Sequence, residues 1–323
     1  MATTTANAAI PDTSALSISG LVYASITFTC WGMAGVWIRL LHYPALFTGG
    51  LRMSVALLGV LPAILLDGAR RRSVLASLRN RESWFLAAAL TAYYLLAVIA
   101  FQYGSVAEVS LFIGTSPAFV LLTKTLRRIA IERNEKIGAT LAAAGVLIVL
   151  GPKILSGAQG MSLAHLAGDV IGLCAASVSA FYAGRFRALH EGGKASPDTM
   201  AVALLCFSFG GFSLLGISQL LHPVALGSLL EPHNLWVTLV LGLLSTSLPS
   251  ITYALAARKL PAIISTTSQL MIPVVGSIGA AILLRELPSF WILPGGVLIV
   301  YGILYMFRQQ TSPVGDGEEP LAD

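Results

Sequence analysis

Residues 45–66, ALFTGGLRMSVALLGVLPAILL, and residues 84–103, WFLAAALTAYYLLAVIAFQY, flank the basic connection DGARRRSVLASLRNRES at 67–83. Each apolar stretch is about 20 residues long, the length that an α-helix needs to cross the ~30 Å hydrocarbon core of a bilayer. The polar connection between them carries five arginines. We therefore interpret this segment as two membrane-spanning helices joined on one side of the membrane.

The same pattern continues along the chain. We expect ten spanning helices, at 19–41, 45–66, 84–103, 106–124, 136–154, 167–186, 200–220, 235–256, 262–284 and 289–307. The composition agrees, because 56% of the residues are hydrophobic, 11% are charged and the mean hydropathy is +0.80. These values are more apolar than those of a soluble domain. The predicted fold class is an all-α membrane protein.

The basic residues are distributed unevenly between the two sides of the membrane. Sixteen of the twenty Lys and Arg residues fall on one side, in the connections after every second stretch and after the last one. Only Arg39, Lys153 and Arg285 fall on the other side, and Arg52 lies inside a stretch. Because cytoplasmic loops are the basic ones, both termini are predicted to be cytoplasmic. This orientation also accounts for the pI of about 9.2 without a nucleic-acid partner.

The two ends of the chain differ from the rest in composition. Residues 1–18 and 309–323 are small, polar and rich in Pro or Gly, so we expect disordered cytoplasmic tails. Residues 1–17 contain no Lys or Arg, unlike the start of a cleaved secretory signal. We therefore expect the first apolar stretch to be retained.

Several kinds of chemistry lack their sequence signature. Cys30, Cys174 and Cys206 have no paired spacing and lie in apolar stretches, so we expect buried thiols. The five histidines form no HExxH motif, and neither a GxxxxGK[ST] loop nor a GxSxG elbow occurs. We expect no metal, no cofactor and no enzymatic activity. Energy for moving a solute would have to come from a gradient.

The two halves of the chain align with each other at a drifting offset. An offset of 148 residues pairs Gly20, Arg39 and His42 with Gly168, Arg187 and His190. An offset of 156 pairs Pro117 with Pro273 and Tyr103-Gly104 with Lys259-Leu260. An offset of 157 pairs Gly138 and Gly145 with Gly295 and Gly302. Insertions in loops would produce such a drift.

This alignment predicts two repeats, at 19–154 and 167–308, joined by an external linker at 155–166. Each repeat has five expected spans, and five is odd, so the second repeat must enter the membrane upside down. Inverted repeats are typical of secondary transporters, whose substrate site lies between the halves near mid-membrane. We therefore expect two inverted five-helix repeats around a central cavity.

Several motifs in the chain carry a family resemblance. They are Trp31-Gly32, Leu51-Arg52-Met53, SVAEVSLFIGTSPAF at 105–119, LPAIISTTSQLMIPVV at 260–275 and Arg285-Glu286. With the ten stretches, they resemble the drug/metabolite transporter (DMT) superfamily, EamA type, over the length between the tails. Glu108-Val109, nine residues before Pro117, resembles the aromatic amino acid exporters of that superfamily. The basic run that begins at Lys124 departs from the family, which usually has an acidic residue there.

The resemblance implies ten helices around a central cavity and export of small metabolites, often amino acids, from the bacterial cytoplasm across the inner membrane. We expect a secondary active transporter of small amphipathic metabolites, with amino acids as the first choice, that works by alternating access. The alternatives are a facilitative channel-like permease or a transporter of another metabolite class, such as drugs or nucleosides. The expected partners are the small-molecule substrate, the lipid bilayer and protons as a candidate coupling ion. The chain could be a monomer or a homodimer.

Two charged residues lie at membrane depth. Arg52 is about seven residues into its stretch, roughly 10 Å deep, where an Arg costs several kcal/mol unless it is paired or hydrated. We expect Glu108, at a similar depth, to be its partner. The pair would form a gate or a clamp for a substrate carboxylate, or else a purely structural link. Glu108 is also a candidate proton carrier, as is Asp169.

Aromatic, hydroxyl and amide side chains at mid-membrane are candidates for lining the cavity. They are Trp31, Tyr94, Phe112, Ser116, Tyr182, Ser247, Tyr253 and Gln269. The alternative is that they pack helices together. Pro117, Pro249 and Pro273 lie inside stretches and are expected to bend or loosen helices, as hinges or as static kinks. In the stretches at 136–154 and 289–307, which we expect to be outer helices, the glycines are predicted positions of close contact.

Overall fold

The computed structural model describes residues 17–126, 128, 130–155, 163–191, 197–260 and 268–307. Within these residues the chain forms helices and no β-strand. The predicted tails and most of the predicted linker lie outside the described residues. The described part confirms the all-α fold class.

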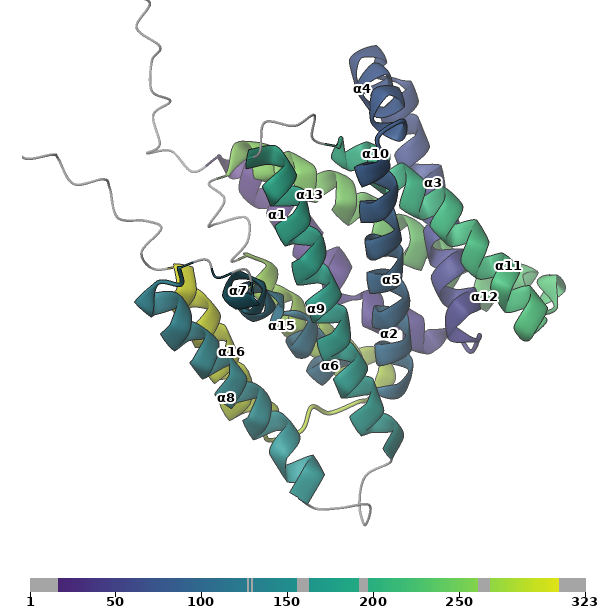
Figure 1. The fold of residues 1–323 in the computed structure, drawn as a ribbon. Helices are drawn as coiled ribbons and strands as arrows, with labels where there is room; N and C mark the ends of the chain where they lie inside the picture. Colours follow the sequence, from purple (N-terminus) through teal and green to yellow (C-terminus); the bar gives the residue numbers. More distant parts are fainter. Residues whose placement is uncertain are drawn as a thin grey trace, which may run out of the picture.

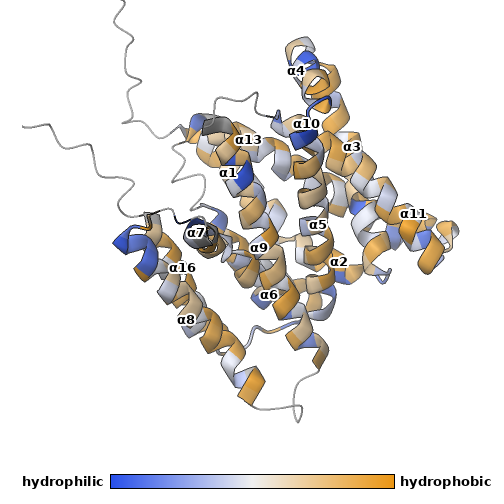
Figure 2. Cartoon of the chain, in the orientation of Figure 1, coloured by the Kyte–Doolittle hydropathy of each residue, from blue (hydrophilic) through white to orange (hydrophobic). Residues whose placement is uncertain are grey.

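Within the described residues an apolar helical stretch overlaps each predicted one, and the count of ten spans stays a prediction. Seven are long enough to cross a membrane: Ile18–Leu40, Ala45–Leu65, Arg81–Tyr103, Arg133–Pro152, Leu163–Leu189, Thr199–Leu221 and Pro232–Ala257. Three are shorter: Val106–Leu122, Ser268–Leu284 and Ile292–Met306. Figure 2 shows hydrophobic residues along most of the helices, and many large hydrophobic side chains are exposed on the surface. A protein that spans the membrane several times explains this surface, because lipid and not water would cover it.

Five stretches are continuous α-helices. They are α3 (Ala45–Leu65), α5 (Arg81–Tyr103), α8 (Arg133–Leu155), α9 (Leu163–Glu191) and α16 (Ile292–Phe307). Their sequences are rich in Leu, Ala, Ile and Val, and α3 and α8 stay continuous although Pro62 and Pro152 lie near their C-terminal ends.

The other stretches are interrupted. The first is divided at Met33 into α1 (Ile18–Gly32) and α2 (Ala34–Leu40), and the fourth is divided at Gly114-Thr115 into α6 (Val106–Ile113) and α7 (Ser116–Leu126). Three stretches contain a π-helical turn. In the seventh, η2 (Cys206–Gly210) lies between α10 (Thr199–Leu205) and α11 (Gly211–Leu221), and in the eighth, η4 (Val240–Ser247) lies between α12 (Pro232–Leu239) and α13 (Leu248–Lys259). In the ninth, the 3₁₀ turn η5 (Ser268–Met271) is followed by α15 (Ile272–Gly279) and the π turn η6 (Ala280–Leu284). A second 3₁₀ turn, η3 (Leu226–Leu230), precedes α12.

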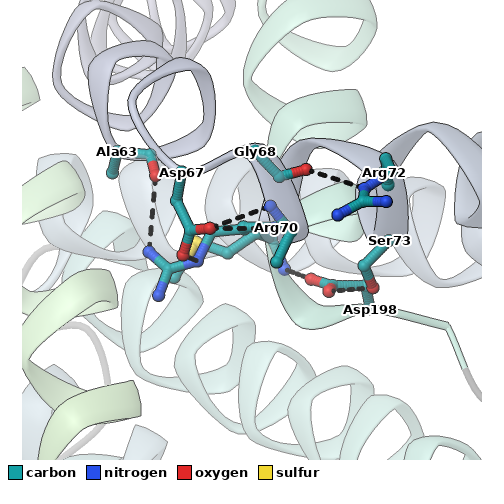
Figure 3. Close-up of polar contacts among 9 residues, drawn as sticks. Ala63, Asp67, Gly68, Arg70, Arg72, Ser73 and Asp198 are labelled. Carbon is teal, nitrogen blue, oxygen red and sulfur yellow. Dashed lines mark hydrogen bonds and ion pairs between the residues drawn. The ribbon is translucent and has the colours of Figure 1, made fainter.

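The basic connection after the second stretch contains a helix, α4 (Gly68–Leu78), that the sequence analysis did not predict. The Asp67 carboxylate caps its first turn by accepting hydrogen bonds from the N–H groups of Ala69 and Arg70, at 3.0 and 3.2 Å (Figure 3). The Ser73 hydroxyl donates to the carboxylate of Asp198, at 2.7 Å. Asp198 is the N-cap of α10, so these bonds tie α4 to the second half of the chain.

Helices from the two halves pack against each other throughout the molecule. α5 lies along α9, and α1 lies along α13. α6 and α7 contact α9, while α15 and η5 contact α1. α3 contacts η4 and α11, and α5 contacts α10 and η2. α8 and α16 lie side by side at one edge of the molecule, as Figure 1 shows.

The predicted close contact of glycines between α8 and α16 is confirmed. A Cβ atom added to Gly145 would lie 2.5 Å from the carbonyl oxygen of Gly295, and one added to Gly302 would lie 2.5 Å from that of Gly138. The backbones of the two helices therefore touch at two levels. Such contact is the usual role of small residues between membrane helices, where lipid competes with larger side chains for packing.

The three cysteines are free, but they differ in burial. Cys206 is buried and Cys30 is half-buried. Cys174 is exposed on α9, so the prediction of a buried thiol is wrong for this residue. It lies on an outer face of a helix whose opposite face is packed, and an apolar stretch alone does not distinguish the two faces.

Replacing Gly145 with Ala should destabilise the protein, because the new methyl group would collide with the Gly295 backbone. We expect a loss of about 1–3 kcal/mol, typical of overpacking. Gly151→Ala is the matched control on the same helix, since no described atom lies within 4 Å of its Cβ position. Thermal unfolding in detergent measures both variants. Equal midpoints for the two variants would contradict the contact.

Candidate functional site

Arg52 is held at the meeting point of three helices. It lies on α3 and is only 4% exposed. Its Nε–H donates to the Thr246 hydroxyl at 2.6 Å, and its Nη2–H donates to the Ser245 carbonyl at 3.2 Å. Its Cζ stands 4.9 Å from the centre of the Tyr94 ring, on α5. A cation in this position is stabilised by the negative face of the ring as well as by the hydrogen bonds.

The partners of Arg52 differ from the prediction. Glu108 is not among them, so the predicted Arg52–Glu108 pair is wrong. The Arg52 side chain turns towards η4 and α5, whereas α6, which carries Glu108, packs mainly against α9 and α15. Counting residues from the end of a span estimates depth in the membrane but not direction around the helix. Glu108 is buried in the first turn of α6.

The π-helical turn η4 places Thr246 against Arg52. Thr246 Oγ1 donates to the Leu241 carbonyl, five residues earlier, at 2.7 Å, while it accepts from Arg52. Glycines let η4 approach α3 closely. A Cβ at Gly242 would lie 3.2 Å from the Arg52 carbonyl, and one at Gly59 would lie 2.9 Å from Ser247 Cβ. Ser247, a predicted cavity residue, is therefore buried between these two helices.

Aromatic and sulfur-containing residues surround this centre. The Tyr94 ring lies 5.4 Å from the Tyr93 ring and 6.0 Å from the Phe207 ring. The Cys206 thiol contacts the Met53 sulfur at 3.6 Å. We call Arg52, Tyr93, Tyr94, Ser245, Thr246, Cys206 and Phe207 the Arg52 cluster. Of these, the sequence analysis had selected Arg52 and Tyr94 as site residues. The run of hydroxyls at 245–247, just before Pro249, was a signal for Ser245 and Thr246, whereas nothing comparable marked Tyr93, Cys206 and Phe207.

A second group of predicted residues comes together nearby. The rings of Trp31, on α1, and Tyr253, on α13, lie 5.6 Å apart, and Tyr253 is hydrogen-bonded to the Gln269 side chain. Tyr182, on α9, lies near Tyr253 and packs against the hydrophobic core that contains Tyr94, Cys206 and Phe207. It therefore connects this Trp31 group to the Arg52 cluster.

Two other predicted residues lie apart from these groups. Phe112 is fully buried in a hydrophobic cluster with Leu111, Val149 and Ile299, so it packs α6 against α8 and α16. Ser116 is half-buried at the start of α7. The structure thus brings five of the eight predicted cavity residues into two neighbouring groups, namely Trp31, Tyr94, Tyr182, Tyr253 and Gln269. Ser247 lies beside them, buried between α3 and η4.

Each of the three predicted hinge prolines lies in the first turn of a helix. Pro117 is the second residue of α7, Pro249 is the second residue of α13 and Pro273 is the second residue of α15. The preceding segments are the turn at Gly114-Thr115, the π turn η4 and the 3₁₀ turn η5. At Pro249, which follows the π turn η4 without a break, the proline lacks the N–H that would continue the helical hydrogen bonding. The helical form changes beside each proline, and a hinge role for these residues stays a prediction.

Ion pairs link the two halves near opposite ends of the helices. Arg39 Nη2, at the end of α2, lies 3.7 Å from Glu286 Oε2, whose other carboxylate oxygen accepts from the Val106 N–H at 2.9 Å. Arg185, on α9, forms a bidentate pair with Glu82, in the first turn of α5. Charged hydrogen bonds of this kind are strong and directional.

Metal-binding residues do not cluster in the described part of the chain. No group of three or more His, Cys, Asp or Glu side chains comes together there.

Comparison with known proteins relates the first half of the chain to a class of membrane protein. Residues 18–151 match the model of the EamA-like transporter family. This is the family that the motifs resemble, but the match covers only the first of the two predicted repeats. The comparison with curated proteins gave no match. The likeness to aromatic amino acid exporters stays a prediction.

The fold of the whole chain is similar to that of a solved structure. The structure, described as "Crystal structure of protein", is 17% identical to this chain, with a TM-score of 0.62. The alignment covers 91% of this chain and 99% of that chain. At this identity the likeness concerns the fold alone, and it extends over both halves.

Replacing Thr246 with Val should destabilise the protein, because the buried Nε–H of Arg52 would lose its acceptor. We expect a loss of about 1–3 kcal/mol, and Thr246→Ser, which keeps the hydroxyl, should recover most of it. The difference between Val and Ser should become smaller when Arg52 is also replaced by Met, because only the bond to the Leu241 carbonyl then separates them. Thermal unfolding of the four single and double variants gives this coupling. Additive effects would contradict the contact.

Proposed function

We propose that the chain is a secondary active transporter that exports small amphipathic metabolites, with amino acids as the leading class, by alternating access. The EamA-like match over residues 18–151 supports a membrane transporter of small molecules. The observation that carries the proposal further is the way in which the two halves contact each other, because it has the pattern expected of an inverted duplication.

Exchanging the two predicted repeats exchanges the helix contacts. In the exchange, the third span (α5) takes the place of the eighth (α13), and the sixth span (α9) takes the place of the first (α1). The contact of α5 with α9 therefore corresponds to the contact of α13 with α1, and both are present. In the same way, α7 with α9 corresponds to α15 with α1, and α3 with η4 corresponds to α10 with α5. The pairs α3–α11, α6–α15 and α8–α16 correspond to themselves. This is the packing that a two-fold axis in the membrane plane would produce.

Individual residues follow the same exchange. A Cβ at Gly20 would meet Leu260 and Lys259, and a Cβ at Gly168 would meet Gly104 and Tyr103. The offsets of 148 and 156 residues, found in the sequence, convert the first contact into the second. The glycine contacts between α8 and α16 are likewise exchanged by the offset of 157. These correspondences support ten spans in two inverted repeats, at 19–154 and 167–308.

Alternating access requires contacts between the halves that can break at one end while they hold at the other. The pairs Arg39–Glu286 and Arg185–Glu82 are suited to this role, because each joins one half to the other. The charge distribution puts the first pair at the external end and the second at the cytoplasmic end. The interruptions before Pro117 and Pro273 lie at corresponding places in the two halves, which suits hinges.

The Trp31 group and the Arg52 cluster are the proposed lining of a central cavity. They combine aromatic walls with few polar anchors, the composition expected of a site for an amphipathic solute.

A facilitative permease, or a transporter of drugs or nucleosides, is the alternative to the proposed function. Protons are the proposed coupling ion, with Glu108 as carrier. The proposed location is the inner membrane, with both termini cytoplasmic and the chain as a monomer or homodimer.

Labelling from one side of the membrane tests the orientation. Gly68 and Gly227 suit cysteine substitution, because both are exposed and no described atom lies within 4 Å of either Cβ position. In a background without Cys30, Cys174 and Cys206, we expect an impermeant maleimide added outside intact cells to label Gly227→Cys and not Gly68→Cys. Permeabilised cells, in which both should react, are the control. Labelling of both sites from outside would contradict the proposed topology.

Uptake into proteoliposomes tests the function. With a panel of labelled amino acids, we expect saturable uptake that is accelerated by unlabelled substrate on the opposite side, since a carrier must return its site and a channel need not. An imposed pH gradient should change the rate, and Glu108→Gln should remove that change. Glu132→Gln, at an exposed carboxylate, is the control. Uptake no faster than in empty vesicles for every solute would overturn the proposal.

A further inference from the structure

Among the described residues, the positive charge of Arg52 has no carboxylate partner. A guanidinium group has five N–H donors. In Arg52, Nε–H donates to the Thr246 hydroxyl and Nη2 donates to the Ser245 carbonyl, and the remaining contact is with the Tyr94 ring. All three partners are electrically neutral. Burying a charge in this way is energetically unfavourable. Apolar residues would form a purely structural link between the helices at a lower free energy.

A second polar group beside Arg52 also has unused bonding capacity. The hydroxyl of Ser245, a residue only 1% exposed, has no hydrogen-bond partner among the described residues. It belongs to the same residue whose carbonyl accepts from Arg52. A buried hydroxyl without a hydrogen-bond partner destabilises the folded protein, and a ligand that bonds to it removes this penalty. Free donors on Arg52 and Ser245 together fit a group that accepts several hydrogen bonds and carries negative charge.

We propose that the Arg52 cluster binds the carboxylate of a small amphipathic solute. The planar guanidinium can hold a carboxylate through two parallel hydrogen bonds, which a neutral amide cannot match. The rings of Tyr93, Tyr94 and Phe207 form an apolar wall beside the charge for the rest of the solute. The inference rests on the proposed function and narrows its substrate class to carboxylates.

The solute reaches Arg52 when α3 and η4 move apart. In this structure the two are in close contact through Gly59 and Gly242. The π-helical form of η4 and the proline that follows it weaken the backbone hydrogen bonding of that helix near Ser245 and Thr246. The carboxylate then takes the place of the neutral groups that now satisfy Arg52.

Paired probes test the proposal on the purified full-length protein. The pairs are phenylalanine with phenylalaninamide and benzoate with benzamide, with phenyl phosphate as a further anion. Binding is measured by the ligand-dependent rise in the unfolding temperature in detergent. In the unsubstituted protein we expect at least one carboxylate to bind about tenfold or more tightly than its amide. If no carboxylate is preferred to its amide, or if phenyl phosphate is preferred to every carboxylate, the assignment is wrong.

Two variants separate ligand binding from a structural role. Arg52→Gln should lower carboxylate affinity to that of the amide and leave amide affinity unchanged, and Arg52→Lys should keep part of the preference. Arg72→Gln, on the exposed face of α4, is the control and should retain it in full. Equal weakening of carboxylate and amide by Arg52→Gln would overturn the proposal. The wild-type comparison decides the matter if this variant does not fold.

The same probes distinguish this proposal from the proposed function. Uptake of phenylalanine without a preference for the carboxylate would refute the carboxylate site and leave the transporter standing. A carboxylate preference that depends on Arg52, without uptake of any amino acid, would refute the transport proposal and leave the binding site standing.

Discussion

A guanidinium ion in an apolar helical bundle needs neighbours that replace water, and Arg52 obtains them from helices of both halves. The Thr246 hydroxyl and the Ser245 carbonyl come from η4, and the Tyr94 ring comes from α5. These neighbours constrain the backbone. Gly59 and Gly242 have to be small so that η4 reaches α3, and the turn of η4 has to be wide so that Thr246 bonds to both Leu241 and Arg52. The local geometry of three helices thus follows from one charge.

The order and extent of the helical stretches could be predicted from sequence, because hydrophobicity over about 20 residues is imposed by the bilayer itself. The glycine contacts between α8 and α16 were also predictable, since small residues in helices with few polar groups indicate close packing. Arg52 and Tyr94 were both selected as candidates. Their contact was not predicted, because it depends on the direction of each side chain around its helix, which length and composition do not determine.

Other features escaped prediction for identifiable reasons. α4 lies in a polar connection without an apolar period, and its first turn depends on capping by Asp67 and on the bonds to Asp198. The interruptions at Met33 and Gly114-Thr115 leave the hydropathy of their stretches unchanged. Phe112 satisfied the same criteria as Trp31 and Tyr253, yet it fills a core. An aromatic residue at mid-membrane suits a core and a pocket equally, and only its neighbours decide.

The three π-helical turns bear on where the two halves of the chain differ in length. Within the described residues all three lie in the second half, at η2, η4 and η6. A turn closed by bonds to the fifth residue, not the fourth, accommodates one additional residue without lengthening the loops. The offset between the halves rises by one residue between Pro273 and Gly295, and η6 lies in that interval. The segment 285–291 lies in the same interval, so the extra residue is absorbed either there or in η6, where a wide turn spares the following residues the rotation of about 100° that a single inserted residue causes.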